Sequence, residues 1–317
     1  MTDSHAPRIS VIIPTYNRPE RLPRAVRSAL VAARDCEVIL VNDASPHLRT
    51  RPVCDHLADA MPQVRVLHLE RNGGVAGARN AALHIARGEY VAFHDDDDAR
   101  ASGSYDRQAD ALDAQPQAAF CHGQAELCAP DGALLGKRHP LEPVVGEAFR
   151  AIAAWNPIQC ITVLMRRAMV EDVGGLDASI TNADDWDLWI RLSARYEVAA
   201  VPGVVAFYRE TQAGSGQGSA RLVEHLRLAR QVQEKAFASP RGQRAGVAWQ
   251  NQARATFDAR ACDWLLHHAS EALHAGLQAE ARSALREALR LNPRRWRSKR
   301  VPYLAARLLL TRPAATP

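Results

Sequence analysis

The sequence predicts an α/β fold followed by a helical region. Runs rich in β-branched residues alternate with amphipathic stretches over the N-terminal third of the chain, and the pattern becomes helical throughout after Ala220. Acidic residues stand directly after several of the runs. Strands and helices that alternate with short connections are typical of a parallel sheet with right-handed crossovers. We therefore expect a sheet flanked by helices, with an α-helical appendage at its C-terminal end.

The N-terminal third contains four predicted buried strands, because short apolar runs are bounded there by loop residues. We place these strands at residues 8–14, 37–41, 64–69 and 90–93. The stretches between them carry apolar residues at helical spacing, and Pro19 and Gly88 suit a helix start and a helix end. We expect these helices at residues 22–30, 52–60 and 75–87.

The following part of the chain mixes shorter elements. We expect helices at residues 104–114, 166–173 and 184–192, and strands at 118–128, 134–138, 159–165 and, as a pair turning at Pro202-Gly203, within 197–208. Residues 211–219 are rich in glycine and serine, as in a flexible active-site lid or a linker. We place the domain boundary there, between residues 1–218 and residues 219–317. Residues 276–293 resemble half of a tetratricopeptide repeat that occurs once, which predicts a helix pair and not an array.

Four consecutive aspartates, Asp95 to Asp98, follow the predicted strand at residues 90–93. Adjacent carboxylates repel one another and resist burial unless a positive charge lies among them. A hard divalent cation is the simplest such charge, because it takes carboxylate oxygens as ligands. Polar side chains also follow the first two strands, at Thr15, Tyr16 and Asp43. The carboxyl ends of parallel strands share one edge, so the pattern indicates a metal or ligand site, with a solvated acidic loop as the alternative.

Composition is ordinary for a globular protein, with 47% hydrophobic and 24% charged residues. No apolar run approaches the ~20 residues that cross a bilayer, and the polar N-terminus does not resemble a signal peptide. The six cysteines are scattered without a Cys-x-x-Cys pair, which predicts free thiols in a reducing cytoplasm. Five basic residues between 294 and 300 account for the formal net charge of +5. Together with the aromatic and apolar residues after them, they predict a peripheral membrane contact through residues 294–310, and no nucleic acid is expected.

Six motifs, in order, resemble the family 2 glycosyltransferases, whose catalytic domain has the GT-A fold. They are SVIIPTYNR at 10–18, VNDAS at 41–45, RNGGVAGARNAAL at 71–83, GEYVAFHDDDD at 88–98, GGLD at 174–177 and DDWDLWIRL at 184–192. The resemblance implies a Rossmann-like, nucleotide-diphospho-sugar transferase fold with a mixed sheet. It also implies an inverting, metal-dependent transfer from a nucleotide-sugar, most simply a UDP-sugar, to a hydroxyl group. The implied acceptor is a glycan or a lipid-linked molecule in bacterial cell-surface polysaccharide synthesis.

The resemblance also assigns roles to the residues at the matched positions. The nucleotide would contact Pro14, Thr15, Tyr16, Asp43, Arg71, Arg79, Asp95 and Asp96. Asp97 would hold Mn²⁺ or Mg²⁺, which bridges the two phosphates and balances the charge of the leaving diphosphate. Asp185 would be the general base that takes the proton from the acceptor hydroxyl. Asp184 and Asp185 also suit a helix N-terminus, where carboxylates commonly serve as caps.

The chain departs from the family pattern at two places. Four aspartates stand where the family has a D-x-D triplet, so Asp96 or Asp98 could replace Asp97 as the metal ligand. Many relatives carry a histidine shortly after a Tyr-Arg pair; Thr211 is a weak replacement for it here, and Arg209 could meet the diphosphate directly. Two alternative functions remain open from the sequence. One is a nucleotidyltransferase on a similar fold, and the other is a non-catalytic binding protein that acts through its helical C-terminal region.

Overall fold

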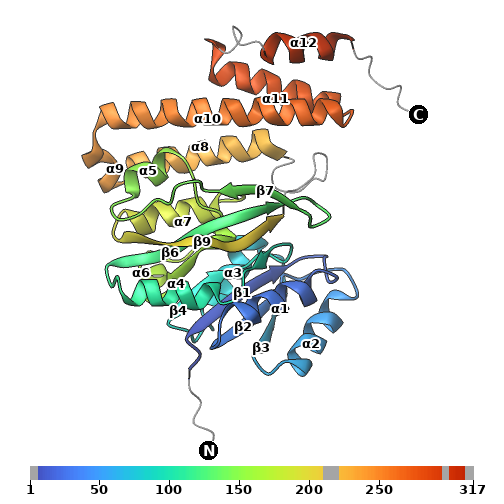
Figure 1. Cartoon of the computed structure of the whole chain (residues 1–317), viewed down its shortest axis with the longest axis vertical. Helices are drawn as coiled ribbons and strands as arrows, with labels where there is room; N and C mark the ends of the chain where they lie inside the picture. Colours follow the sequence, from blue (N-terminus) through green and yellow to red (C-terminus); the bar gives the residue numbers. More distant parts are fainter. Residues whose placement is uncertain (1–5, 210–220, 295–299, 311–317) are drawn as a thin grey trace, which may run out of the picture. The chain divides into compact units, whose positions relative to one another are not determined.

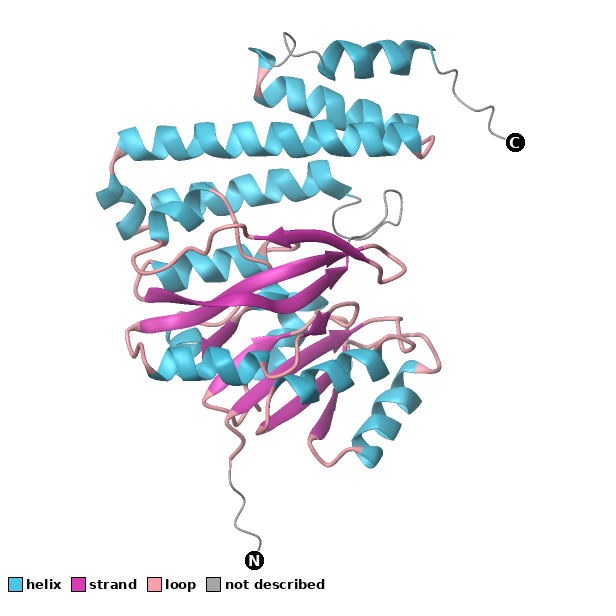
Figure 2. Ribbon diagram, in the orientation of Figure 1, coloured by secondary structure: helices cyan, strands magenta, loops and turns pink. Residues whose placement is uncertain are grey.

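The computed structural model describes residues 6–209, 221–294 and 300–310. The chain divides into two compact units, one made of Met1–Ile152 and Asn156–Glu210, the other of Ala153–Trp155 and Thr211–Pro317. The first unit is α/β and the second is helical, as Figures 1 and 2 show. The predicted lid or linker at residues 211–219 lies outside the described residues, so its nature stays a prediction.

A nine-stranded mixed sheet forms the framework of the first unit. The strand order is β3-β2-β1-β4-β8-β6-β9-β5, and β7 pairs with β6. The strands are β1 (Ile9–Thr15), β2 (Cys36–Asn42), β3 (Val64–His68), β4 (Tyr90–Phe93), β5 (Ala99–Arg100), β6 (Ala118–Cys128), β7 (Leu134–His139), β8 (Leu164–Arg166) and β9 (Glu197–Arg209). The pairs among β3, β2, β1 and β4 are parallel, whereas β8 runs antiparallel to both β4 and β6. The mixed sheet implied by the resemblance is therefore confirmed. The parallel pairing expected from strand-helix alternation holds among the first four strands, and β6 and β9 also pair in parallel.

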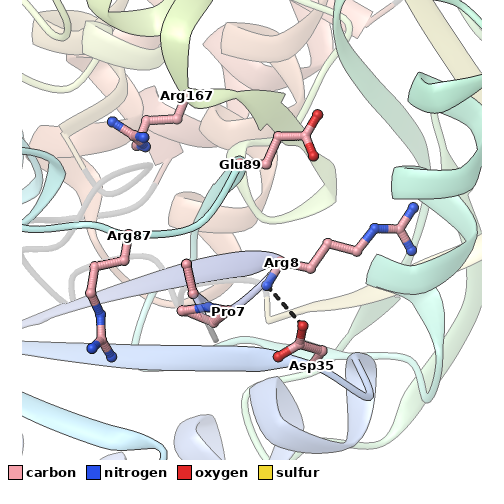
Figure 3. A pocket seen from close by; sticks show the side chains of 7 residues that line it. Pro7, Arg8, Asp35, Arg87, Glu89 and Arg167 are labelled. Carbon is pink, nitrogen blue, oxygen red and sulfur yellow. Dashed lines mark hydrogen bonds between the residues drawn. The ribbon is translucent and has the colours of Figure 1, made fainter. Parts of the chain in front are cut away.

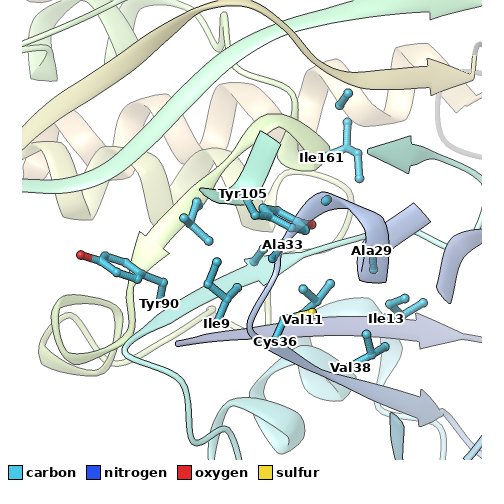
Figure 4. Packing of buried hydrophobic residues seen from close by; sticks show 14 of the residues in the cluster. Ile9, Val11, Ile13, Ala29, Ala33, Cys36, Val38, Tyr90, Tyr105 and Ile161 are labelled. Atoms are coloured by element: carbon cyan, nitrogen blue, oxygen red, sulfur yellow. The ribbon is translucent and has the colours of Figure 1, made fainter. Parts of the chain in front are cut away.

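Helices cover the central strands on both faces, which explains why β1 and β2 are buried along their whole length. Ile9, Val11 and Ile13 join one apolar cluster with residues of α1, α2 and α4 (Figure 4). Ile12, which alternates with them along β1, is also fully buried, and α3 packs on β1 and β2. The helices of this unit are α1 (Leu22–Ala32), α2 (Thr50–Ala60), α3 (Gly74–Leu83), α4 (Ser104–Asp113), α6 (Arg167–Asp172) and α7 (Asp184–Ser193).

Two strand assignments in the first unit differ from the structure. The expected strand pair around Pro202-Gly203 is the single strand β9, because the register against β6 shifts between His122 and Gln124 and absorbs these residues in a bulge. The expected strand at residues 159–165 is a 3₁₀ turn, Cys160–Thr162, followed by the short β8. The two-residue β5, which pairs with β9, has no signal in the sequence that we recognised.

The second unit consists of packed helices. They are α8 (Leu222–Ala238), α9 (Pro240–Ala245), α10 (Val247–His274), α11 (Gln278–Leu291) and α12 (Arg300–Leu310), and α5 (Phe149–Ala154) ends in this unit. Trp155 packs edge-on against Phe257 and Trp264, with ring centroids 5.6 and 6.2 Å away. Residues 276–293, which resemble half of a repeat, contain one helix, α11, and this helix packs against α10 (Figure 2).

The predicted membrane segment is only partly visible, because residues 295–299 lie outside the described part of the chain. In α12, Leu304 and Leu308 are buried, whereas Tyr303 is exposed. Among the described helices, none has the length and apolar character that a bilayer crossing requires. A peripheral membrane contact through residues 294–310 stays a prediction.

Gly88 lies where the loop before β4 passes close to the backbone at the start of β1. A Cβ atom at this position would lie 2.5 Å from the Ser10 nitrogen and 2.8 Å from the Ile9 carbonyl carbon, both in the backbone of a central strand. We predict that Gly88→Ala lowers the free energy of unfolding by about 2 kcal/mol or more, because overpacking against backbone is not relieved by a side-chain rotation. Urea unfolding followed by circular dichroism measures the change.

Gly77→Ala is the matched control for this prediction. Gly77 lies inside α3, and a Cβ atom there would meet nothing within 4 Å. Alanine is the better helix former, so this variant should gain about 0.5–1 kcal/mol. Equal stability of the two variants would contradict the steric explanation.

Candidate active site

The predicted site residues gather at the carboxyl edge of the parallel strands. β1 lies between β2 and β4, so the chain leaves these strands on opposite sides of β1. Such a reversal of strand order opens a crevice at the carboxyl ends, where α/β proteins bind ligands. Thr15 ends β1, Asp43 follows β2, and the aspartates 95–98 follow β4. Sheet topology therefore brings together three segments that are far apart in the sequence.

The four aspartates divide into an inward pair and an outward pair. Asp96 and Asp98 are buried, whereas the side chains of Asp95 and Asp97 are 35% and 18% exposed. Asp96 Oδ2 accepts a hydrogen bond of 2.8 Å from Thr15 Oγ1, and Asp98 Oδ1 accepts one of 2.9 Å from the backbone nitrogen of Arg209. Burial raises the pKa of Asp96 to about 7 and raises the pKa of Asp98 well above its usual range. The inward pair thus supports the loop, and the outward pair remains accessible to a ligand.

Two arginines at the start of α1 contact the outward Asp97. Arg18 Nη1 and Arg21 Nη1 donate to the same oxygen, Asp97 Oδ2, over 3.0 and 2.9 Å. Arg18 Nη2 also lies 2.8 Å from Asp96 Oδ1. The loop between β1 and α1 therefore supplies the positive charge for this part of the aspartate run.

Arg79 links the aspartate run to a second acidic segment. Its guanidinium group is almost fully buried; Nη2 donates to Asp95 Oδ1 over 2.6 Å, and Nη1 donates to Asp184 Oδ2 over 3.2 Å. The guanidinium carbon lies 5.1 Å from the centre of the Phe93 ring. Burial opposes ionisation, but the surrounding acidic groups outweigh it, so the pKa of Arg79 is raised and the side chain stays charged. One buried cation thereby holds carboxylates from β4 and α7 on either side of itself.

Asp184 and Asp185 begin α7, as the motif predicted. Asp185 is partly exposed, and its Oδ1 accepts a hydrogen bond of 2.6 Å from the backbone nitrogen of Trp186. Desolvation, together with the neighbouring charge of Asp184, raises the pKa of Asp185 to about 7. Such a carboxylate can accept a proton near neutral pH, which a carboxylate with an ordinary pKa does poorly. The N-cap position of α7 is Ala183, so Asp185 bonds to a backbone nitrogen of the first turn without being the cap itself, and its role as the base stays a prediction.

The residues predicted to hold the nucleotide base lie around the ends of β1 and β2. Asp43 Oδ1 accepts a hydrogen bond of 2.7 Å from the Gly73 nitrogen at the start of α3, and burial raises the pKa of Asp43. Pro14 is buried within β1, while Tyr16 is 44% exposed. Arg71 is exposed and forms no ion pair with another described residue. Thr211 lies outside the described residues, and these nucleotide contacts stay predictions.

The carboxylates at this edge suit a divalent cation in part. Among the residues that the structure describes, no three His, Cys, Asp or Glu side chains are arranged to hold a metal ion. Magnesium-like ions, however, are commonly bound by one or two carboxylates together with substrate phosphates and water. Asp95 and Asp97 offer hard oxygen ligands at the accessible side of the loop. The chemistry of these donors therefore fits a cation that binds together with a diphosphate.

A hollow at the opposite edge of the sheet is the pocket drawn in Figure 3. Its lining comes from residues that precede β1 and β4, together with parts of neighbouring loops and α6. Its charged groups are already paired: Arg8 N donates to Asp35 Oδ2 over 3.1 Å, and Arg87 Nη2 lies 3.0 Å from Glu37 Oε2. It lies at the amino ends of the strands, away from the acidic cluster, and we assign it no role in catalysis.

Comparison with known proteins identifies the family to which the segments of the carboxyl edge belong. The sequence profile described as glycosyl transferase family 2 matches residues 10–168, which is about half of the chain and includes β1, β2, α3 and the aspartate run. The chain belongs to glycosyl transferase family 2. It is thus a glycosyltransferase, which sets aside both alternatives, the nucleotidyltransferase and the non-catalytic binding protein.

Relatives of this glycosyltransferase include two proteins of Bacillus subtilis. The uncharacterized glycosyltransferase YwdF is 29% identical over 219 residues, which is 67% of this chain and 78% of YwdF. The putative teichuronic acid biosynthesis glycosyltransferase TuaG is 31% identical over 190 residues, which is 59% of this chain and 72% of TuaG.

Two solved structures share the fold. One is the mannosyltransferase PcManGT of Pyrobaculum calidifontis in complex with GDP-Man and Mn²⁺; it has a TM-score of 0.59 and 21% identity, with coverage of 96% of this chain and 87% of that one. The other is TarS of S. aureus in complex with UDP-GlcNAc, with a TM-score of 0.59 and 18% identity over 95% of this chain and 88% of the TarS chain. At these identities the likeness supports the GT-A fold of the glycosyltransferase and nothing finer.

Sequence reasoning did not assign roles to three residues of the glycosyltransferase site. Arg18 and Arg21 contact Asp97, and Cys160, in the 3₁₀ turn before β8, lies near the buried Arg79. Burial raises the pKa of the Cys160 thiol, so it remains neutral. The signal for the two arginines was their position. They follow the first strand, and this end of the strand lies at the same sheet edge as the four aspartates. Cys160 had no such signal.

Removal of Arg79 should destabilise the enzyme. We predict that Arg79→Ala lowers the free energy of unfolding by about 3 kcal/mol, because Asp95 and Asp184 would lose the buried cation between them. Urea unfolding provides the measurement. The exposed arginine of the same motif is the control, and Arg71→Ala should change stability by less than about 0.5 kcal/mol. Similar losses for the two variants would show that the buried bridge carries no special stability.

Proposed function

We propose that this glycosyltransferase moves a sugar from a nucleoside diphosphate sugar, most simply a UDP-sugar, to a hydroxyl acceptor with inversion. The observation that carries the proposal is the bridge made by Arg79. Its two terminal nitrogens reach Asp95 in the aspartate run and Asp184 beside Asp185. The diphosphate end of a bound donor and the proposed general base would therefore flank one compact site.

Each group at the site has a defined task in this reaction. Asp185 accepts the proton of the acceptor hydroxyl while that oxygen forms a bond to the anomeric carbon, and the bond from this carbon to the diphosphate breaks. Asp95 and Asp97 would hold Mn²⁺ or Mg²⁺, which supplies charge compensation to the departing diphosphate. Asp43 and Tyr16 would bind the base, the first as a hydrogen-bond acceptor and the second by stacking on the ring. Attack from the side opposite the diphosphate gives inversion.

The acceptor is proposed from the relatives alone. TuaG is described as a teichuronic acid biosynthesis glycosyltransferase, and a further relative, GgaB of Bacillus subtilis, as a minor teichoic acid biosynthesis protein. GgaB is 36% identical over 100 residues. We therefore propose a glycan or lipid-linked acceptor in bacterial cell-surface polymer synthesis, with the enzyme acting on the cytoplasmic side.

Nucleotide binding tests the proposal directly. We predict that UDP raises the melting temperature by several degrees when Mn²⁺ is present, because a ligand at 100 times its dissociation constant stabilises the folded state by about 2.7 kcal/mol. A thermal-shift screen of UDP, GDP, CDP and ADP, each with and without Mn²⁺, makes the measurement and identifies the base. Asp97→Asn should remove the dependence on Mn²⁺, whereas Asp59→Asn, at an exposed position of α2, should not. Absence of a shift with every nucleotide would contradict the proposal.

Asp185→Asn should separate catalysis from stability. We predict that turnover of the donor falls about 10²-fold or more, because the proton acceptor is lost. The stability of the variant, in contrast, should be higher than that of the wild type. Burial raises the folded-state pKa of Asp185, so the ionised carboxylate costs stability in full at pH values above about 7. The neutral asparagine avoids that cost. The advantage of the variant should therefore grow as the pH rises from about 4 to about 7 and should vanish below that window.

Two measurements check this prediction. Thermal unfolding between pH 4 and pH 9 gives the stability difference, and donor hydrolysis over the same range gives the activity, which should rise in the wild-type enzyme as the pH passes through about 7. Asp59→Asn makes the same chemical change at an exposed carboxylate and should alter neither property. Wild-type turnover by Asp185→Asn would assign the base to another residue.

A further inference from the structure

Arg18 and Arg21, here called the arginine pair, converge on the carboxylate that is proposed to hold the metal. Each donates one guanidinium hydrogen bond to Asp97 Oδ2, over 3.0 and 2.9 Å. Arg18 reaches the neighbouring carboxylate as well, with Nη2 2.8 Å from Asp96 Oδ1. The arginine side chains are 29% and 30% exposed. A single carboxylate oxygen is therefore shared by two permanent positive charges at the accessible side of the site.

The backbone fixes the arginine pair at this position. Arg21 occupies the N-cap position of α1, and its backbone nitrogen donates to the Arg18 carbonyl over 3.2 Å. Leu22 and Ala25, in the first turns of α1, are fully buried in the core. Asp96, between Asp95 and Asp97, is held by Thr15 at the end of β1. Only the outer parts of the two arginine side chains are free to turn away from Asp97.

A divalent cation alone should bind poorly beside the arginine pair. A carboxylate oxygen offers about two lone-pair directions, and both are used by arginine donors at Asp97 Oδ2. A cation that binds Oδ2 would have to displace these hydrogen bonds. A cation that binds the other oxygen, Oδ1, would leave them in place, but on either oxygen it would lie within a few ångströms of two guanidinium charges, which repel it. Asp97 is thus less attractive to a free cation than its position in the acidic run suggests.

A nucleoside diphosphate would make the site attractive to the cation. Guanidinium groups match phosphate oxygens in geometry and bind them through paired hydrogen bonds. If the arginine pair turns to the diphosphate, Asp97 Oδ2 becomes available to the cation, and the phosphates add both ligands and negative charge. The nucleotide and the cation then assist each other through the same two side chains.

We propose that the arginine pair makes cation binding at Asp97 dependent on the nucleoside diphosphate. The inference rests on the proposed function, since it assumes a nucleotide-sugar donor at this sheet edge. Coupling between two ligands is reciprocal, so the cation must strengthen nucleotide binding by the same factor by which the nucleotide strengthens cation binding. A cation would then enter the site together with its donor and would not remain there in the absence of donor.

The test measures Mn²⁺ affinity by electron paramagnetic resonance titration, with and without saturating UDP or GDP. The proteins are the wild type, Arg21→Gln, Arg18→Gln and the control Arg27→Gln, which changes an exposed arginine of α1. Arg21→Gln should bind Mn²⁺ about five times more tightly than the wild type without nucleotide, and the gain on adding nucleotide should shrink by a similar factor. Arg18→Gln should act in the same direction, and Arg27→Gln should match the wild type.

Each outcome of the titration has a defined meaning. The inference is overturned if Arg21→Gln and Arg18→Gln bind Mn²⁺ without nucleotide no more tightly than the wild type, while nucleotide still binds the wild type. If none of UDP, GDP, CDP and ADP binds the wild type or Arg27→Gln with Mn²⁺, the proposed function itself is wrong, and the inference falls with it. Thermal melts show whether each variant is folded, and both arginines of the pair are partly exposed, so folding should be retained.

Discussion

The site depends on compensation of negative charge at one edge of a sheet. Seven carboxylates, those of Asp43, Asp95 to Asp98, Asp184 and Asp185, lie at or near the ends of β2, β4 and the start of α7. Ionised carboxylates this close destabilise a fold unless each is paired, bonded to donors or protonated. The structure uses all three: arginines pair with Asp95, Asp97 and Asp184, a backbone nitrogen donates to Asp43, and raised pKa values favour protonation of Asp96 and Asp98.

This division separates structural acids from acids that can act on a ligand. Asp96 and Asp98 are buried and hold the loop to Thr15 and to the backbone of Arg209. Asp95 and Asp97 alternate with them and are the more exposed pair, in a turn that the hydrogen bond from Asp98 N to Asp95 O closes over 3.2 Å. The four aspartates obscured the D-x-D registry in the sequence, but in the structure buried and accessible side chains alternate along the run. Because only two of the four side chains are accessible, the run contains no preformed set of three metal ligands among the described residues.

The sequence predicted the framework of the site better than its details. β1, β2 and β4 were predictable because buried strands consist of continuous apolar runs, and the acids that follow them mark the sheet edge. The single strand β9 was not predictable, because Pro202 normally interrupts a strand and only the shifted register against β6 accommodates it. Arg18 and Arg21 were overlooked because a loop arginine is usually solvated, and nothing local indicates that its partner lies 76 to 79 residues away.

Arg79 is the clearest case in which the local sequence pattern does not predict the contacts of a side chain. On α3 it resembles any arginine of a helix, and its exposure could not be derived from the spacing of its neighbours. Its partner Asp95 is 16 residues away and its partner Asp184 is 105 residues away. The bridge forms only because β4 and α7 are assembled around the same crevice, so it is a property of topology and not of any motif. Since the same guanidinium contacts the aspartate run and the segment that carries Asp185, displacement of one carboxylate must change the electrostatic environment of the other. A cation bound at Asp95 would therefore change the basicity of Asp185 through one buried side chain.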